Sequence, residues 1–216
     1  MIKTIKKIIK SNYLWIIFFI CILLFLALAE DVFTHEIMKG DIIGYNLVSK
    51  YLIKTNITPI VKYITWFGSA TCLILISLLS FVIKNKKISI CILSNLVIVT
   101  LLNQLFKFIF ERPRPTEYRI ITETGYSFPS GHSMVSMAFY GFIIYLIYKN
   151  VNNKYIKWLV ISILSLLIVS IGISRIYLGV HYTSDVLAGF LISISYLIIY
   201  IKYTKKIIDK DSNYEK

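Results

Sequence analysis

The feature that most constrains this chain is a series of long apolar blocks separated by short lysine-rich segments. About 18 or more consecutive apolar residues are enough to cross a bilayer as a helix. The 216 residues are 57% hydrophobic and 16% charged, whereas a soluble domain has about 45–50% apolar and about 25% charged residues. Because the apolar excess is concentrated in these blocks, the sequence predicts an integral membrane protein.

The blocks predict an all-α fold, a single membrane domain over 1–216 built as a six-helix transmembrane bundle with short extracytoplasmic loops and helices. A basic start and an Ala27-Leu28-Ala29 ending would also suit a cleaved signal peptide, but the first block exceeds the usual 7–15-residue signal core. We therefore expect the first span to be retained. The expected spans are about 13–29, 60–83, 88–106, 134–148, 158–173 and 186–200, followed by a polar, frayed tail, 202–216.

The positive charges indicate how the bundle is oriented in the cell membrane. With six spans the connecting segments alternate in side, and one set holds 15 of the 24 lysines and arginines. Segments rich in Lys and Arg stay in the cytoplasm, which predicts cytoplasmic termini. The net charge of +13 then fits loops that face anionic lipid, and we expect no nucleic-acid partner. The basic set comprises residues 1–12, 84–87, 149–157 and 202–216.

Two further features carry little functional weight. Ile42 to Ile53 could form an amphipathic helix on the membrane surface, but we favour an ordinary loop helix, with His35 a solvated loop residue nearby. The three cysteines lie inside apolar blocks and form no CxxC pattern, so we expect neither disulfides nor a metal cluster. These are Cys21, Cys72 and Cys91.

Three polar segments on the predicted outer side carry the residues suited to chemistry. Lys107 ends the third span, and Arg114-Pro115 follows in a proline-stiffened loop. Arginine binds phosphate through two parallel hydrogen bonds. Alone, this pair would more simply be a snorkelling lysine and a solvated arginine.

The second segment, Pro129-Ser130-Gly131-His132, enters the fourth span. Ser130 suits a helix N-cap and Gly131 permits close backbone approach to a ligand. The free N–H groups of a helix start attract anions, and His132 beside such an anion could protonate a leaving oxygen. A plain capping turn is the alternative.

The third segment runs from Ser174-Arg175 to His181 and Asp185. His181 and Asp185 are four residues apart, which places them on one face if the segment is helical. Asp185 would then orient the His181 imidazole, which could act as a base or a nucleophile, while Arg175 would bind phosphate. Helix capping and surface charge are the alternative for this segment alone.

Together, the three segments resemble the signature motifs of the type 2 phosphatidic acid phosphatase (PAP2) superfamily, which also includes vanadium haloperoxidases and bacterial acid phosphatases. Every motif residue is present, in order and in spacing, from the third span onward. The resemblance implies that His181 attacks phosphorus, Asp185 orients it, and His132 protonates the leaving oxygen and then activates water. The implied phosphate-binding residues are Lys107, Arg114, Ser130, Gly131 and Arg175.

The resemblance implies a metal-independent lipid phosphatase, with no cofactor, that acts at the outer face. Among such enzymes we expect an undecaprenyl pyrophosphate phosphatase, because the spent polyprenyl carrier is released on that side. Phosphatidylglycerophosphate or phosphatidic acid is the alternative substrate. A lipid transporter with a phosphate-binding vestibule would need the cations but no nucleophile, and a vanadate-dependent oxidant is disfavoured by the six spans.

Overall fold

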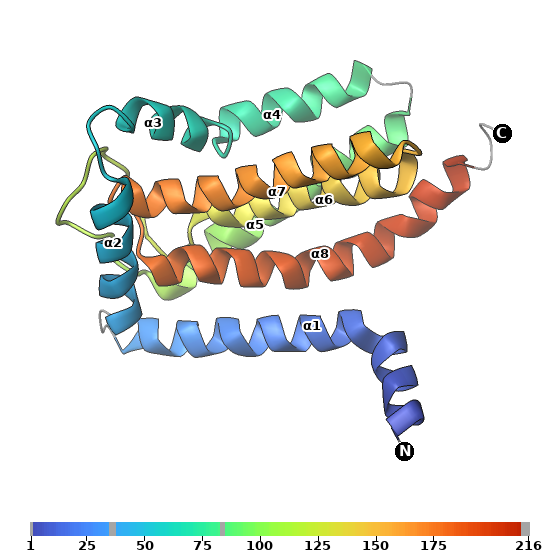
Figure 1. Ribbon diagram of the computed structural model, residues 1–216, viewed down its shortest axis with the longest axis horizontal. Helices are drawn as coiled ribbons and strands as arrows, with labels where there is room; N and C mark the ends of the chain where they lie inside the picture. Colours follow the sequence, from blue (N-terminus) through green and yellow to red (C-terminus); the bar gives the residue numbers. More distant parts are fainter. Residues whose placement is uncertain (1, 35–37, 83–84, 213–216) are drawn as a thin grey trace.

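The computed structural model describes residues 2–34, 38–82 and 85–212, and this part of the chain contains helices and no strand (Figure 1). His35 lies outside the described residues, as do residues 83–84 and the end of the tail, 213–216. A single 3₁₀ turn, Ser80–Val82, follows α4. The α-helices are α1 (Ile2–Phe33), α2 (Lys39–Leu52), α3 (Thr58–Trp66), α4 (Ala70–Leu79), α5 (Lys86–Phe110), α6 (Gly131–Asn150), α7 (Lys154–Tyr177) and α8 (Thr183–Ser212).

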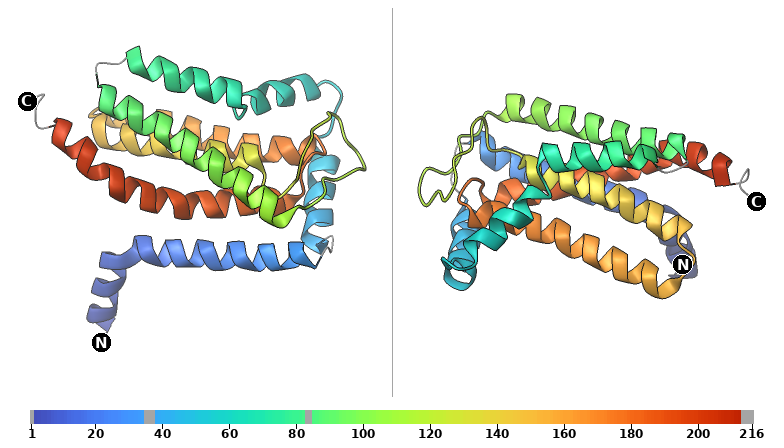
Figure 2. Two further views of the ribbon diagram at one scale, coloured as in Figure 1. Left: turned by 180° about the vertical axis from the view of Figure 1, so that it is seen from behind. Right: turned by 90° about the horizontal axis from the view of Figure 1, so that it is seen from above.

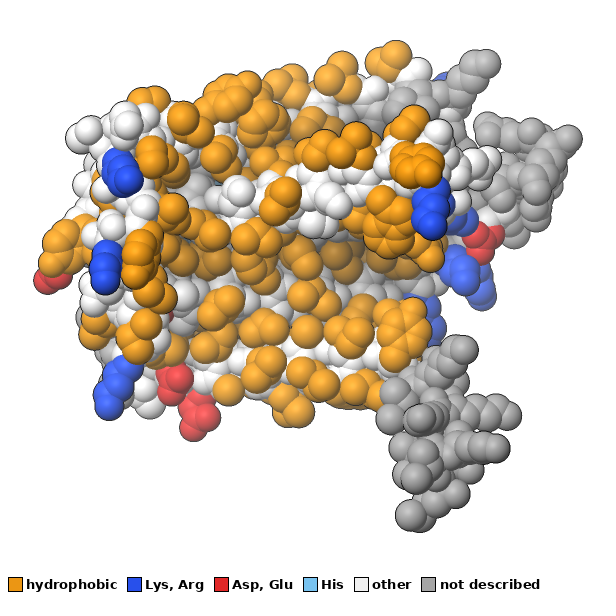
Figure 3. Space-filling view, viewed as in Figure 1, with side chains coloured by type: hydrophobic (Ala, Val, Ile, Leu, Met, Phe, Trp, Pro, Cys, Tyr) orange, Lys and Arg blue, Asp and Glu red, His pale blue; other side chains and the backbone are white. Residues whose placement is uncertain are grey.

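The long helices lie side by side along the longest axis of the molecule, with α6 packed against α5, α7 and α8 and with α1 against α8 (Figures 1 and 2). Phe139, Phe142 and Ile171 are buried in the core between them. Apolar side chains also cover the outside of the bundle, and many of the charged ones lie at its two ends (Figure 3). An apolar outer surface of this extent suits a protein surrounded by lipid.

The prediction of an all-α membrane bundle is confirmed: five described helices are long and apolar enough to span a bilayer, and a bent helix pair makes a sixth candidate. The second predicted span, 60–83, is not one helix, because α3 and α4 meet at a 47° bend. The Ser69 side chain caps α4 by accepting from the Cys72 N–H (3.3 Å), and the Tyr140 hydroxyl donates to the Phe67 carbonyl (2.8 Å). These contacts satisfy polar groups that the break leaves free.

The tail that was expected to fray continues α8 as far as Ser212. Lys149 at the end of α6 forms an ion pair with Asp209, and Ile208 is buried. Tertiary contacts therefore extend the helix beyond the last apolar block.

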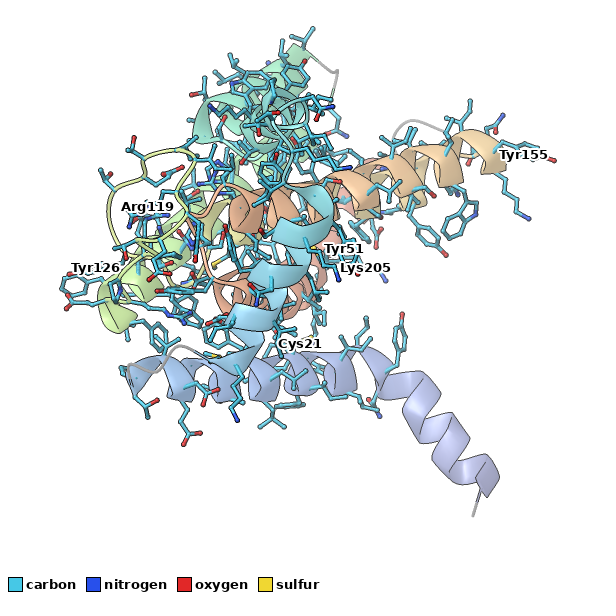
Figure 4. All side chains as sticks on the ribbon, turned by 60° about the vertical axis from the view of Figure 1, so that its left-hand side comes forward. Cys21, Tyr51, Arg119, Tyr126, Tyr155 and Lys205 are labelled. Atoms are coloured by element: carbon cyan, nitrogen blue, oxygen red, sulfur yellow. The ribbon has the colours of Figure 1, made fainter. Side chains whose placement is uncertain are left out.

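Three elements with polar residues gather at one end of the bundle. The α5–α6 loop, which carries Arg119 and Tyr126, lies there with the α7–α8 turn, and α2 crosses the same end at a steep angle to the spans (Figures 1 and 4). The start of α1 and the end of α8 lie at the other end (Figure 1). On α2, Asp41 is buried whereas Ile42 and Ile43 are exposed. This two-faced helix fits the membrane-surface alternative better than the ordinary loop helix that we favoured.

Candidate active site

The predicted nucleophile pair lies at the junction of α7 and α8, but not on one helix. Ser174 and Arg175 belong to the last turn of α7, His181 lies in the turn, and Asp185 lies in the first turn of α8. Asp185 Oδ2 is 3.4 Å from His181 Nδ1 and also accepts from the Tyr182 N–H at 2.8 Å. Asp185 therefore caps its own helix and reaches back to the imidazole.

A positive backbone angle shapes this turn. Gly179 has a φ of +68°, and a Cβ at this position would clash with the carbonyl of Tyr118. Leu178, one residue earlier, accepts a hydrogen bond from the Ile120 N–H at 3.0 Å. The glycine thus lets the turn that carries His181 pack directly against the α5–α6 loop.

Hydrogen bonds define which nitrogen of His181 is free to react. Arg114 Nη1 lies 3.1 Å from His181 Nε2, and a guanidinium can only donate, so Nε2 is the acceptor and carries a lone pair. The proton is then on Nδ1, which faces Asp185 and, at 3.2 Å, Ser127 Oγ. Ser127 in turn donates to Asp185. This tautomer leaves Nε2 directed at the cationic group of Arg114.

The charge state of His181 follows from its surroundings. Burial lowers the pKa of the imidazole to about 4, with Asp185 opposing the shift and the positive charges of Arg175 and Arg114 adding to it. His181 is therefore neutral at physiological pH. A neutral imidazole is the form that can act as a nucleophile.

Arg114 is fixed by the backbone around it. Its Nε donates to the Gly125 carbonyl (3.0 Å), Nη2 to Thr124 (3.1 Å) and Nη1 to Val180 (3.0 Å). Burial lowers the pKa of its guanidinium from the ordinary value. Since the side chain is held on three sides before any ligand binds, an anion would meet a preorganised cation.

Arg175 is almost completely buried, with 1% of the residue exposed. Its Nη2 pairs with Glu123 Oε1 at 2.5 Å, its Nη1 donates to Thr65 Oγ1 at 2.9 Å, and its Nε has no protein partner among the described residues. Burial alone would raise the pKa of the Glu123 carboxyl, but the hydrogen bond and charge of Arg175, and the charge of Arg114, lower it below the usual value. The unpartnered Nε–H of Arg175 is therefore a donor that a bound anion can use.

The second motif begins α6 as predicted, and its glycine, Gly131, allows the side chains at the end of α5 to approach closely. A Cβ on Gly131 would lie 3.0 Å from Asn103 Oδ1 and 4.0 Å from Lys107 Cε. Lys107 Nζ donates to the Tyr126 carbonyl at 2.9 Å. Ser130 occupies the N-cap position, but its side chain makes no capping bond and its hydroxyl accepts from Ser133 at 3.0 Å.

One cavity of about 430 Å³ joins most of the predicted site residues. Six of the eight line it: Lys107, Arg114, Gly131, His132, Arg175 and His181. Ser130 and Asp185 are fully buried and are not among the lining residues. The two imidazoles therefore share one chamber, and the carboxylate supports it from behind.

Away from the predicted site residues, one wall of this cavity is apolar and is formed by α4 and α5. Several of its lining side chains are about half exposed on the lipid-facing surface, which leaves the chamber open from the side. Gly68, at the break between α3 and α4, also lines it, and a Cβ there would come within 3.1 Å of His132 Cδ2. The apolar wall consists of Leu73, Ile74, Leu93, Leu96, Val97 and Leu101.

Sequence reasoning missed several residues that support this site. Ser127, one of them, contacts both members of the dyad, and Arg112 donates to Asp185 Oδ1 at 2.6 Å. Arg112 and Glu123 are charged residues of the α5–α6 loop, but nothing in the sequence indicates their partners. Asp41 and Thr65 had no signal, because a single polar residue in an apolar or mixed segment is common.

Comparisons with known proteins show which chains this one is similar to. The model of the PAP2 superfamily matches residues 88–209. A phosphatidylglycerophosphatase B of Bacillus subtilis is 31% identical over 194 residues, covering 86% of this chain and 93% of that protein. An undecaprenyl-diphosphatase of Sulfolobus acidocaldarius is 28% identical over 209 residues, covering 90% and 94%.

Among solved structures, a crystal structure of a transmembrane PAP2-type phosphatidylglycerolphosphate phosphatase from Bacillus subtilis is similar to this chain, with a TM-score of 0.77 and 28% sequence identity. The match covers 87% of this chain and 95% of that one. At this coverage the shared fold extends beyond residues 88–209, the region that carries the motifs.

Proposed function

This chain belongs to the PAP2 superfamily of lipid phosphatases, and we propose that it releases the terminal phosphate from a polyprenyl diphosphate, undecaprenyl pyrophosphate, at the outer face of the cell membrane. Phosphatidylglycerophosphate or phosphatidic acid is the second candidate, favoured by the similarity to the Bacillus subtilis enzyme.

One observation carries the proposed chemistry: Nε2 of His181 carries no proton and faces Arg114 inside a cationic chamber, so its lone pair becomes available when the Arg114 N–H shifts to a phosphoryl oxygen. Attack of this nitrogen on the terminal phosphorus would form a phosphohistidine and break the bond to the bridging oxygen of the diphosphate. His132, as the imidazolium, would protonate that oxygen as the lipid monophosphate leaves, then regain the proton from the water that cleaves the phosphohistidine. Lipid monophosphate, free phosphate and the starting imidazole result.

Lys107, Arg114 and Arg175 would bind the phosphoryl oxygens together with the N–H groups at the start of α6 near Gly131. Phosphoryl transfer needs mainly positioning and charge stabilisation, which three cations can supply. Ser130 stays a predicted phosphate ligand, although its hydroxyl is bonded to Ser133. Asp185 would orient His181 and stabilise its positive charge.

The apolar wall supports a lipid substrate. A prenyl or acyl chain could enter from the bilayer between α4 and α5 while the phosphate reaches the cations. The lysine-rich α6–α7 connection lies at the bundle end opposite the site, which supports an outward-facing site under the positive-inside rule (Figure 1).

A phosphate-release assay on the purified protein in lipid vesicles tests the proposal. Undecaprenyl pyrophosphate, phosphatidylglycerophosphate and phosphatidic acid are compared at equal surface concentration, with His181→Ala as the inactive control. We expect the highest kcat/KM with the diphosphate. A higher kcat/KM with a glycerophospholipid would favour the second candidate substrate. If a folded protein releases phosphate from none of the three lipids, the proposed phosphatase activity is wrong.

A further inference from the structure

A buried chain of charges continues from the catalytic carboxylate to α2. Arg112 Nη1 donates to Asp185 Oδ1 at 2.6 Å, and Arg112 Nη2 donates to Asp41 Oδ2 at 2.8 Å. Asp41 is 3% exposed, Arg112 5% and Asp185 0%. Burying three charged groups is unfavourable unless each is well paired, so any change in the geometry of this chain of charges is costly.

Asp41 also fixes the start of α8. Its Oδ1 accepts from the Ser184 N–H at 2.8 Å, and its Oδ2 accepts from the Ser184 hydroxyl at 3.0 Å. Ser184 Oγ is in addition 2.8 Å from Arg112 Nη1. A carboxylate on α2 therefore acts as an N-terminal cap for the helix that carries Asp185.

The guanidinium of Arg112 is held from a third direction. It lies over the ring of Tyr182, 4.1 Å from the ring centroid, in the turn next to His181. Neither Arg112 nor Asp41 lines the chamber that contains the predicted phosphate-binding residues. Both residues therefore act on the chemistry from outside that chamber, through the carboxylate of Asp185 and the start of α8 that they hold.

We propose that Arg112 and Asp41 are positioning residues: Arg112 fixes the carboxylate of Asp185 against His181, and Asp41 neutralises the charge that Arg112 would otherwise impose on that carboxylate. This inference rests on the proposed function of the site. It assigns to α2, which lies across the bundle end outside the parallel helices, an indirect part in the reaction, through the carboxylate of Asp185 (Figure 4).

Arg112 and Asp41 have opposite effects on the protonation of the dyad formed by His181 and Asp185. Without Arg112, two neighbouring carboxylates remain, which favours the protonated form of His181 or of Asp185. Without Asp41, the full positive charge of Arg112 acts on Asp185, which makes His181 less basic. Without both, the net charge is the same as in the native pair.

Other charged groups also act on His181, and all of them stay unchanged in the variants described next. Asp185 belongs to α8, Arg175 to α7, His132 to α6 and Lys107 to α5. The α5–α6 loop adds Arg114 and Glu123, and the uncharged Ser127 hydroxyl completes the contacts. A change in pH dependence would therefore report the altered pair.

The test compares Arg112→Gln, Asp41→Asn and the double variant by the pH dependence of kcat/KM. In Arg112→Gln we expect the acid limb to move up by about one pH unit, with kcat reduced roughly tenfold to hundredfold. Asp41→Asn should lower kcat roughly tenfold with no upward movement of the limb. The double variant should return the limb to the native position while kcat stays low.

Charge-matched controls separate this effect from a general change in charge. Lys54→Gln and Glu30→Gln each remove one exposed charge near the same bundle end, and both should keep the native profile. Gel filtration in detergent establishes that each variant is folded. If Arg112→Gln does not fold, Arg112→Lys replaces it, and it should lower kcat without moving the limb because the charge remains but the fork of donors is lost.

Three results would overturn the inference: native kcat in Asp41→Asn, a native acid limb in a folded Arg112→Gln, or a double variant whose limb stays as far displaced as in Arg112→Gln. The last result is expected of a merely structural pair. Each of these comparisons requires that the native protein releases phosphate. If the native protein has no activity, the proposed function is wrong and the positioning roles of Arg112 and Asp41 have no reaction to act on.

Discussion

Replacement of Asp185 by Asn tests how the site supports its nucleophile. Asn keeps the size of the side chain but cannot balance the positive charge that develops on the imidazole when Nε2 bonds to phosphorus. With Nδ1 and Oδ2 3.4 Å apart, unit charges interact by roughly 5 kcal/mol at an effective dielectric constant of about 20. Arg112, 2.6 Å from the same carboxylate, neutralises part of this charge.

We therefore take about 4 kcal/mol as the loss in the transition state, which corresponds to a decrease in kcat of roughly a thousandfold. The assay is phosphate release under saturating lipid, with Glu30→Gln as a control that removes an exposed carboxylate. Folding is checked by gel filtration and by thermal unfolding in detergent. A folded Asp185→Asn protein that keeps more than about a tenth of native kcat would refute this reasoning.

Three further predictions address the acid, the pH range and metals. His132→Gln should lower turnover of phosphatidylglycerophosphate, whose alkoxide leaving group needs a proton, by roughly 10²–10⁴-fold but phosphorylation by p-nitrophenyl phosphate far less, because p-nitrophenolate leaves without one; equal losses would remove His132 from the acid role. The acid limb of the kcat/KM profile should have its midpoint at about pH 4, where Nε2 of His181 becomes protonated, whereas an acid-limb midpoint near 6.5 would contradict the buried imidazole. Treatment with EDTA should leave activity unchanged, since the proposed roles use only protein cations; loss of activity restored by a divalent metal would show otherwise.

The residues that carry the three motifs were predictable because each has a type and a spacing that serve phosphate chemistry. Lys107, His132 and Arg175 are far apart in the sequence, yet they line one chamber because the ends of α5, α6 and α7 lie at the same end of the bundle. Hydrophobic length alone indicated the spans. The distribution of Lys and Arg among the connecting segments indicated which helix ends lie on the same side of the membrane.

The break in the second span could not be seen in the sequence. Residues 60–83 read as one apolar block, and Gly68-Ser69 alone does not stop a membrane helix. The bend depends on Tyr140, which donates to the Phe67 carbonyl from another helix, and on Ser69, which caps α4. Such tertiary contacts are not encoded in local periodicity.

The supporting charges were missed for a related reason. Asp41 lies 71 residues before Arg112 and 143 before Ser184, and only the packing of α2 across the bundle end brings them into contact. In α2 the aspartate is buried and its apolar neighbours Ile42 and Ile43 are exposed, which is the reverse of what hydrophobicity alone would predict. A carboxylate in a mixed loop segment looks the same whether it is solvated or paired.

Direct detection of the covalent intermediate tests the central claim most closely. The protein is mixed with excess lipid substrate, quenched in alkali, in which phosphohistidine survives, and digested for mass spectrometry, in native form and as His132→Gln to slow hydrolysis. The account predicts one phosphate on His181 and none in His181→Ala. Phosphate on another residue, or steady turnover by His181→Ala, would contradict it.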